Sequence, residues 1–487
     1  MLVSLYTVRV VLSVLGAEDF GIYNVVAGVV LMFSFLSGAM ATASQRFLSF
    51  EMGRGNEQEL ENIFSVTLAI YLFLSVLLII VAETLGLWFI NTKLVIPPER
   101  LTAAKWVYQC AIISFLITIM TTPYMSAIIA HENMNVYAYV SIVEAVLKLA
   151  VVLFLRIGKT DKLILYGILL LGVAIINTAL YRSYCKRHYK ECKFRISWNS
   201  DKFKEIISYI GFDLFGNFSV LIRTQGVNLL LNVFFTAIIN AATAIATSIQ
   251  NTVMSFANNL LSAFRPQIVK SYASNDYKEM IKLIRISAVF TTYLLLLFSL
   301  PLSLEIDFVL KMWLKEVPFH TSMICQYLLI FNVIANLSSV IMTGIHATGR
   351  IKRSSFINGS LYILVIPVSC VGYKMGLSVE FAFIFNICMV CCGLFQNMCA
   401  LHNYVMDFWK STFFARAIFP NIVIATIVYM CGLFFQKHFE PSLFRLFFTV
   451  IFTTLFLSLL TYCFVFTQNE RILLRNKLNN AIKDKIL

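Results

Sequence analysis

Fourteen apolar stretches, separated by short loops, occupy most of this 487-residue chain. Most are about 20 residues or longer, which is enough α-helix to cross the roughly 30 Å hydrocarbon core of a bilayer. They lack the polar–apolar alternation that marks the strands of a membrane barrel. The sequence therefore predicts an all-α polytopic membrane protein with about 14 transmembrane helices, at residues 1–15, 22–47, 63–90, 101–129, 136–155, 163–181, 206–233, 239–264, 281–302, 321–345, 356–371, 379–400, 417–435 and 443–466.

The basic residues are divided unequally between the two sides of the predicted membrane. With alternate loops on opposite faces, one face collects 25 of the 39 Lys and Arg residues, including the loops 182–204 and 265–285 and the tail 471–487. By the positive-inside rule this face is cytoplasmic, which predicts a multi-pass protein of the cytoplasmic (inner) membrane with both termini inside. The net charge of +14 is thus explained by topology and does not indicate nucleic-acid binding. The tail also alternates basic and apolar residues, which favours contact with anionic membrane lipids.

The cysteines predict neither a disulfide framework nor a metal site. Of the eleven, nine lie in or beside predicted spans, where a free cysteine behaves as a small hydrophobic residue. The other two, Cys185 and Cys192, lie on either side of His188 in a basic loop. They lack the paired Cys-x-x-Cys spacing of zinc sites, so we expect no bound metal.

The chain repeats part of its own pattern. A shift of 219 residues lays Arg46 on Arg265, Asn56 on Asn275 and Glu57 on Asp276, in each case after one apolar hairpin and before the next span. Because six spans separate the copies, the halves should be parallel, as in many secondary transporters. Chance similarity of two amphipathic loops is the alternative. The repeat predicts two pseudo-repeated six-helix lobes plus two C-terminal helices, with an N-terminal lobe at 1–181, a basic linker at 182–205, a C-terminal lobe at 206–402 and a final segment at 403–487.

The first predicted span is shorter than its counterpart. Under the same shift Met1 corresponds to Val220, whereas the seventh span begins near Ile206. The first span thus lacks about 14 residues, and its ~15 residues reach only ~23 Å. We expect Met1 to be an internal methionine and the true start to lie upstream, with a naturally short first helix as the alternative. A cleavable signal peptide is not indicated, because no basic region precedes the apolar run.

Four segments resemble polysaccharide-export proteins. They are LGAEDFGIYNVV (15–26), QRFLSFEMGRGN (45–56), GFDLFGNFSVLIRTQGVNLLLNVFF (211–235) and FRPQIVKSYA (264–273). The chain is similar to Wzx-like flippases of the multidrug/oligosaccharidyl-lipid/polysaccharide exporter superfamily. This resemblance implies a two-lobe transporter that moves undecaprenyl-diphosphate-linked oligosaccharides to the outer leaflet. The family has no single invariant catalytic motif, so no set of site residues is transferred from it.

Polar side chains inside the spans are the candidate site residues, because such groups are costly in hydrocarbon and usually face a cavity. The seventh span carries a polar stripe at steps of four, seven and four, with an arginine at its margin: Asp213, Asn217, Thr224 and Asn228, with Arg223. The eighth span carries a second stripe, formed by Thr247, Asn251, Ser255, Asn258 and Ser262. Arg9 lies in the first span, and Glu144 and Lys148 stand four apart in the fifth, where they can pair.

We expect the two arginines to bind the diphosphate, since a guanidinium matches phosphate oxygens bidentately. The expected substrate-binding residues are Arg223, Arg9, Asn217, Thr224, Asn228, Asn251, Ser255 and Asn258, and the ion-coupling candidates are Asp213, Glu144 and Lys148. Structural alternatives stay open. The eighth-span stripe could join neighbouring helices, the Glu144–Lys148 pair could neutralise itself, and Asp213 could simply be solvated. Arg223 could instead lock its helix through Asp213 or Glu144, and Glu83 could line an exit.

These observations predict a lipid-linked oligosaccharide flippase that works by alternating access, without cofactor and without enzymatic activity. Its expected partners are the lipid-diphosphate glycan and other polysaccharide-assembly membrane proteins. The first alternative is a cation-coupled multidrug or metabolite exporter, which should place acids rather than arginines at mid-depth. The second is a membrane-embedded glycan polymerase, which the short outer loops disfavour. The absence of a Walker motif argues against an ATP-driven transporter.

Overall fold

The computed structural model describes residues 10–11, 14–16, 18–23, 26, 28, 30, 33–92, 97–155, 161–192, 200–235, 237–314, 316–465 and 471. Within these ranges, 11 helices are long and apolar enough to cross a membrane. Helices α2 (Ser34–Arg54) and α9 (Ala237–Ala273) are 21 and 37 residues long, but their polar side chains keep them below the hydropathy of the other eleven. The first predicted span, with Arg9, falls mostly outside the described residues. The prediction of an all-α polytopic protein with about 14 helices is confirmed.

The chain divides into two compact units, Met1–Asn217 (unit 1) and Phe218–Leu487 (unit 2). The boundary falls inside α8 (Ser200–Phe234), a single 35-residue helix that contributes to both units. Residues 193–199 of the predicted linker lie outside the described residues. The linker and lobe boundaries expected from the sequence stay predictions.

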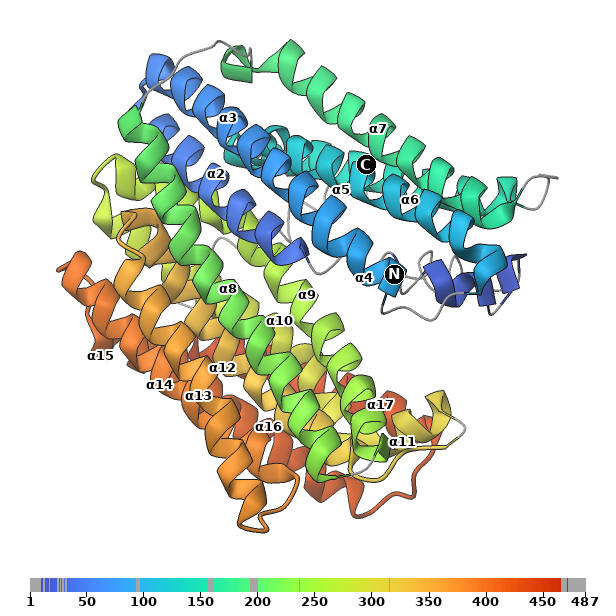
Figure 1. Ribbon diagram of the computed structural model, residues 1–487. Helices are drawn as coiled ribbons and strands as arrows, with labels where there is room; N and C mark the ends of the chain where they lie inside the picture. Colours follow the sequence, from blue (N-terminus) through green and yellow to red (C-terminus); the bar gives the residue numbers. More distant parts are fainter. Residues whose placement is uncertain are drawn as a thin grey trace, which may run out of the picture. The chain divides into compact units, whose positions relative to one another are not determined.

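Unit 1 is built around one central helix. Its remaining elements are α3 (Glu57–Val81), the π-helical turn η1 (Ala82–Gly86), α4 (Leu87–Thr92), η2 (Pro98–Arg100), α5 (Leu101–Ala130), α6 (Met134–Phe154), α7 (Lys162–His188) and η3 (Lys190–Cys192). Helix α5 packs against α2, α3, α6 and α7, while α2 also packs against α3, and α6 against α7 (Figure 1). The π-helical turn is held by the Tyr108 hydroxyl, which donates to the Ala82 carbonyl at 2.7 Å. A Cβ at Gly86 would lie 1.9 Å from that hydroxyl, so the approach requires glycine.

Unit 2 repeats this arrangement. Its first elements after α9 are α10 (Tyr277–Leu304), α11 (Ile306–Trp313), α12 (Thr321–Thr348), α13 (Lys352–Lys374) and α14 (Glu380–Tyr404). Helix α12 packs against α9, α10 and α14, while α9 also packs against α10, and α13 against α14. Five of the six pairings of unit 1 recur when α9, α10, α12, α13 and α14 replace α2, α3, α5, α6 and α7; the packing of α5 against α6 is the exception. The two pseudo-repeated lobes predicted from the sequence are therefore present.

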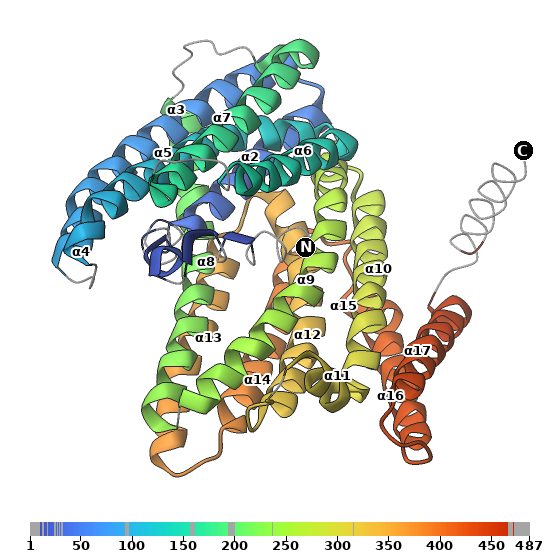
Figure 2. The ribbon, with the colours of Figure 1, turned by 90° about the vertical axis from the view of Figure 1, so that its right-hand side faces the viewer.

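Two further membrane helices follow the repeat. After α15 (Lys410–Phe413) and the π-helical turn η4 (Phe414–Ile418), α16 (Phe419–Gln436) and α17 (Leu443–Phe464) form a hairpin. Both pack against α10, at the edge of unit 2 (Figure 2). Gly432 permits the approach of α16, because a Cβ there would lie 2.4 Å from a methyl of Leu304. Of the predicted basic tail only Arg471 is described.

The structure corrects the register of the repeat by one residue. The Asn56 side chain caps α3 by accepting from the Glu59 amide at 3.1 Å, and Asp276 caps α10 by accepting from the Glu279 amide at 3.0 Å. The backbone bonds of the two turns agree with this pairing, which corresponds to a shift of 220 residues rather than 219. The sequence alignment instead placed Asn56 on Asn275. That alignment matched identical residue types. The structurally equivalent residues are the helix caps, whose side chains accept hydrogen bonds from the first backbone amides of each helix.

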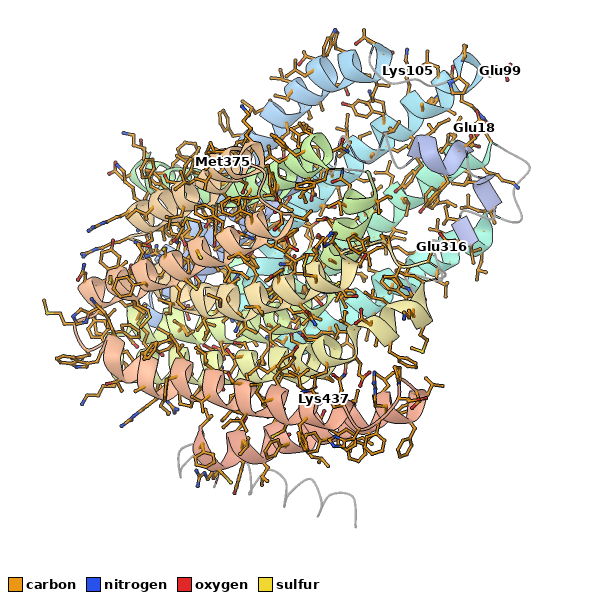
Figure 3. All side chains as sticks on the ribbon, turned by 90° about the horizontal axis from the view of Figure 1, so that it is seen from below. Glu18, Glu99, Lys105, Glu316, Met375 and Lys437 are labelled. Carbon is orange, nitrogen blue, oxygen red and sulfur yellow. The ribbon has the colours of Figure 1, made fainter. Side chains whose placement is uncertain are left out.

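Ion pairs join loops at opposite ends of unit 1. At one end Arg100 binds Asp19 at 2.9 Å and Asp161 at 2.7 Å, which ties together the turns before α5 and α7 and the turn at Asp19. Glu18 and Glu99, labelled in Figure 3, precede Asp19 and Arg100 in the chain and so belong to the turns at this end. At the other end Lys202 lies 3.5 Å from Glu59, and His131 lies 2.5 Å from Glu191. Alternate loops therefore share an end, as the membrane topology requires; which end is cytoplasmic stays a prediction.

Candidate functional site

A large cavity lies within unit 1. It encloses about 590 Å³ between α5, α6 and α7, a volume within the range of about 300–1,000 Å³ usual for ligand pockets. Hydroxyl and aromatic side chains dominate its polar lining. They are Tyr23, Ser114, Thr118, Thr121, Thr122, Tyr137, Ser141, Tyr166, Thr178 and Tyr181, beside Glu144, Lys148 and Asn177.

Helical spacing explains how α6 presents polar groups to this cavity. Tyr137, Ser141, Glu144 and Lys148 follow one another at steps of four, three and four, so they share one face of an otherwise apolar helix. Opposite them, the hydroxyls of Thr121 on α5 and Thr178 on α7 are hydrogen-bonded at 2.5 Å. Helices α5 and α7 therefore meet through a polar contact at the wall of the cavity.

Glu144 and Lys148 form the ion pair that the sequence predicted. The Lys148 ammonium lies 2.6 Å from one Glu144 oxygen, and the Asn177 amide donates to the other oxygen at 3.1 Å. The Lys148 side chain is 49% exposed and that of Glu144 33%. Glu144 thus has two partners for its charge, and the half-exposed Lys148 side chain lines the cavity. Asn177 was missed by sequence reasoning, although a single amide in an apolar span is a usable signal.

A second, smaller cavity lies in unit 2. It encloses about 50 Å³ and is lined by residues of α8, α9, α12 and α14: Arg223, Thr224, Val227, Asn228, Thr243, Thr247, Gln250, Leu328, Ala382, Phe383 and Asn386. Three residues predicted from the seventh span, Arg223, Thr224 and Asn228, meet here. The cavity is too small for a sugar diphosphate in this conformation.

Arg223 is 8% exposed and contacts groups that the sequence did not point to. Its Nη1 donates to Oδ1 of Asn386 at 2.8 Å. Its guanidinium carbon lies 4.7 Å from the ring centre of Phe331 and 4.8 Å from that of Tyr362. Asp213 stands ten residues away on the same helix, about 15 Å along its axis, and Glu144 is paired with Lys148. In the described structure Arg223 therefore contacts an amide and two aromatic rings.

The other predicted residues lie elsewhere. Of the stripe predicted on the eighth span, Thr247 lines the small cavity, whereas Asn251, Ser255 and Asn258 are exposed on α9 and do not line it. Asp213 is buried in unit 1 and accepts a hydrogen bond from Nδ2 of Asn217 at 3.4 Å. Arg9 lies outside the described residues. Glu83, within the π-helical turn, accepts from Gln109 at 3.2 Å. The structure thus separates the predicted set between two units.

The basic loop offers no evident metal ligands in its described part. Cys185 is buried and donates to the Tyr124 carbonyl at 3.3 Å, and Cys192 is buried as well. His188 is directed to the Tyr184 carbonyl at 3.0 Å. In the described ranges no three His, Cys, Asp or Glu side chains are grouped to hold a metal.

Comparison with known proteins identifies the fold. No family model matches the chain, and no curated protein matches its sequence. Among solved structures, it is similar to a MOP-superfamily transporter from Pyrococcus furiosus whose binding pocket has reversed polarity, with a TM-score of 0.71 and 11% identity over 83% of this chain and 92% of that one. The fold is that of the MOP-superfamily transporters.

Two MATE transporters have the same fold. An outward-facing multidrug resistance MATE transporter gives a TM-score of 0.67 at 11% identity, and the Vibrio cholerae MATE transporter VcmN gives 0.61 at 14%, each over 83% of this chain and 92% of that one. At such identities the likeness concerns the fold alone. It agrees with the superfamily expected from the sequence and does not distinguish the oligosaccharide branch.

Proposed function

We propose that this protein translocates undecaprenyl-diphosphate-linked oligosaccharides from the cytoplasmic to the outer leaflet, for surface polysaccharide biosynthesis, by alternating access. The observation that carries the proposal is the cavity of about 590 Å³ within unit 1. Its size suits several sugar rings. Its lining combines hydroxyl groups, which hydrogen-bond sugar hydroxyls, with tyrosine rings, whose faces suit the apolar faces of sugars.

The charge of this cavity supports a neutral or anionic substrate. Glu144 is engaged by Lys148 and Asn177, so it presents little free negative charge. The half-exposed ammonium of Lys148 can add a phosphate oxygen to its contacts without losing Glu144, because it has three donors. We place the diphosphate at Lys148 rather than at Arg223, whose cavity of about 50 Å³ has no room for it.

The second candidate is a cation-coupled exporter of drugs or metabolites. The solved structures favour it, since two of those named are MATE transporters and one is described as a multidrug resistance protein. In this role Glu144 would accept a proton and release Lys148, so that binding of the coupling ion and of the cargo alternate. Transport would then depend on Glu144 and would be lost in Glu144→Gln.

Purified protein in liposomes tests the two candidates together. One set of vesicles carries a labelled lipid-diphosphate oligosaccharide, and its movement is measured by the binding of a lectin to glycan that has reached the opposite leaflet. The other set of vesicles carries a cationic dye. We expect the glycan to move and the dye to stay. Lys148→Met should slow glycan movement about tenfold or more, the value of one charge-assisted hydrogen bond of roughly 1.5–3 kcal/mol.

The matched control is Lys374→Met, which removes an exposed lysine at the end of α13 and should leave the rate unchanged. Dye transport without glycan transport would replace the first candidate by the second. Full glycan transport by Lys148→Met would refute the role of that ammonium.

A further inference from the structure

We infer that unit 2 contains a binding site for a small inorganic anion of about the size of chloride, at Arg223. The site is separate from the cavity assigned to the glycan and does not depend on the proposed function. It rests on three features of the small cavity in unit 2: its charge, its donors and its size.

The first feature is a buried cation without a carboxylate. The Arg223 side chain is more than nine-tenths buried and lines the cavity. In the described part of the chain, no Asp or Glu contacts its guanidinium, and none lines the cavity. Phe331 and Tyr362 attract the cation through their rings but carry no charge. A buried guanidinium without a counter-charge is unfavourable, so the site favours an anion.

The second feature is the set of donors around the cavity. A guanidinium has five N–H donors, and Asn386 accepts from one of its nitrogens. The hydroxyls of Thr243 and Thr247 donate to backbone carbonyls of α9 at 2.8 and 2.7 Å, so they are engaged elsewhere. The amides of Asn228 and Gln250 also line the cavity. One Gln250 hydrogen is used on Asn332, at 3.1 Å, which leaves the second for a ligand.

The third feature is size. The cavity of about 50 Å³ has room for one or two particles of the size of water, which occupies about 30 Å³ in the liquid. Chloride is only slightly larger than water and fits. Pyrophosphate, or the diphosphate of a lipid-linked sugar, does not. All of these anions are attracted to Arg223, but the volume of the cavity admits chloride and excludes the larger phosphate compounds.

The experiment follows the thermal unfolding of the purified full-length protein in detergent, at constant ionic strength, while chloride replaces gluconate. Because a ligand that binds the folded state raises the unfolding temperature by mass action, wild type should gain several degrees and then saturate. Bromide should act as chloride does, and pyrophosphate should give no such gain. A gain with pyrophosphate and none with chloride would overturn the small-anion assignment in favour of a phosphate group.

Two variants locate the effect. Arg223→Met should lose the chloride response, while Arg416→Met, the same change at an exposed arginine of the same unit, should keep it. If Arg223→Met does not fold, Asn386→Asp decides the question. It places a carboxylate where the amide oxygen now lies, 2.8 Å from the guanidinium nitrogen, and so supplies the anion from within the chain.

The expected result for Asn386→Asp is stability without chloride that matches the saturated wild type, and no further gain when chloride is added. A full chloride response in Asn386→Asp or Arg223→Met would show that chloride acts elsewhere and would overturn the assignment. Absence of any chloride effect on wild type would overturn it as well.

Discussion

At the scale of single residues, the protein accommodates two cations inside its helices in different ways. Lys148 lies one helical turn from Glu144 and pairs with it at 2.6 Å, so its charge is balanced locally. Arg223 has no such neighbour and is held by Asn386 and two aromatic rings from other helices. The pair of Glu144 and Lys148 is therefore neutral overall whether or not substrate is bound, whereas the positive charge of Arg223 is available to attract an anionic ligand. This difference is why we assign them separate roles.

Asp19 provides a residue-scale prediction on pH. Burial raises the pKa of this carboxyl even though Arg100 is 2.9 Å away, and its other oxygen, Oδ1, is buried with no partner in the described structure. An acid whose pKa is raised by folding binds its proton more tightly in the folded state, so stability falls as the pH rises above the unfolded pKa. As the pH rises from about 4 to about 7, the unfolding temperature of the wild type should therefore fall relative to that of Asp19→Asn. Thermal unfolding in a pH series measures the difference, and a difference that is flat or grows in favour of wild type contradicts the prediction.

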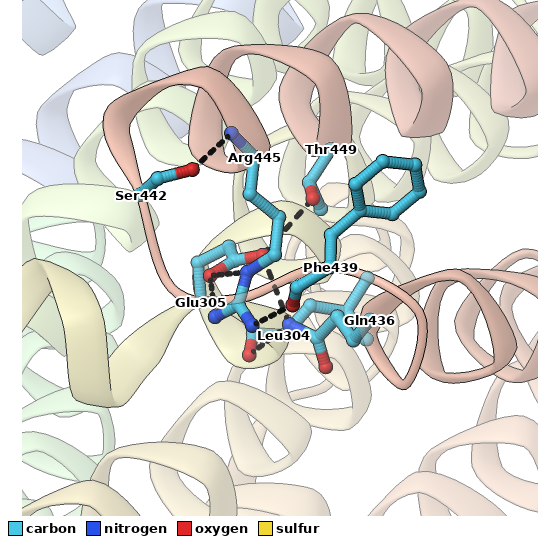
Figure 4. A network of polar contacts seen from close by, with 7 residues as sticks. All are labelled: Leu304, Glu305, Gln436, Phe439, Ser442, Arg445 and Thr449. Carbon is cyan, nitrogen blue, oxygen red and sulfur yellow. Dashed lines mark hydrogen bonds and ion pairs between the residues drawn. The ribbon is translucent and has the colours of Figure 1, made fainter.

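At the scale of elements, a buried ionic network holds the final hairpin on unit 2 (Figure 4). Glu305, between α10 and α11, accepts from Arg445 at 2.7 and 3.2 Å. It also accepts from Gln436 and Thr449, both at 3.0 Å. Arg445 donates further to the Phe439 carbonyl at 3.0 Å. Because every partner of Glu305 in this network lies on α16 or α17, the network docks both helices on one carboxylate.

Arg445→Met should weaken this docking strongly. Glu305 is 1% exposed, and a buried carboxylate that loses its cation typically costs about 3–5 kcal/mol. We expect a lower unfolding temperature and faster proteolysis of the loop between α16 and α17. The double variant Arg445→Met/Glu305→Gln should recover much of the loss, because a neutral amide can still accept from Gln436 and Thr449.

Lys437→Met is the control for this prediction, since Lys437 is exposed in the same loop and is labelled in Figure 3. It should leave the unfolding temperature unchanged. If the double variant were no more stable than Arg445→Met alone, the buried charge would not be the cause of the loss.

At the scale of the whole molecule, the repeat gives each unit the same internal packing. A central helix, α5 or α12, packs against the equivalents of three neighbours in each unit, and in unit 1 alternate loops meet at the same end. Such parallel repeats are typical of transporters that move by rocking one half against the other. The cavities within the units carry the proposals on what is bound.

Topology is the whole-molecule prediction. Reporter fusions within residues 182–204 and 265–285 and in the tail should report the cytoplasm, while fusions within 91–99 and 303–320 should report the outside. The physical reason is the excess of Lys and Arg on the first set of loops, which the positive-inside rule keeps in the cytoplasm. An external signal from the loop 182–204 would reverse the orientation and the direction of transport that we infer.

The amino-acid sequence was sufficient to predict the helices, the repeat and the pairing of Glu144 with Lys148. Each of these depends on local properties: the length of an apolar run, the recurrence of a turn and the fact that residues four apart share one face of a helix. The predicted register of the repeat was wrong by one residue. The alignment matched the identical residues Asn56 and Asn275, whereas the residue that caps the helix in the second unit is Asp276. Local patterns of this kind are readable without knowledge of the neighbouring helices.

Which polar residues meet depends on how the helices pack, and this was seen first in the three-dimensional structure. On α9 the sequence pointed to a stripe of which only Thr247 lines the cavity; its companions there are Thr243 and Gln250, while Asn251, Ser255 and Asn258 are exposed. The choice between faces depends on how the helix is rotated against its neighbours, and Asn386 joins Arg223 only because α14 packs beside α8 at that depth. Rotation and depth follow from the packing of many side chains at once, which no single stretch of sequence contains.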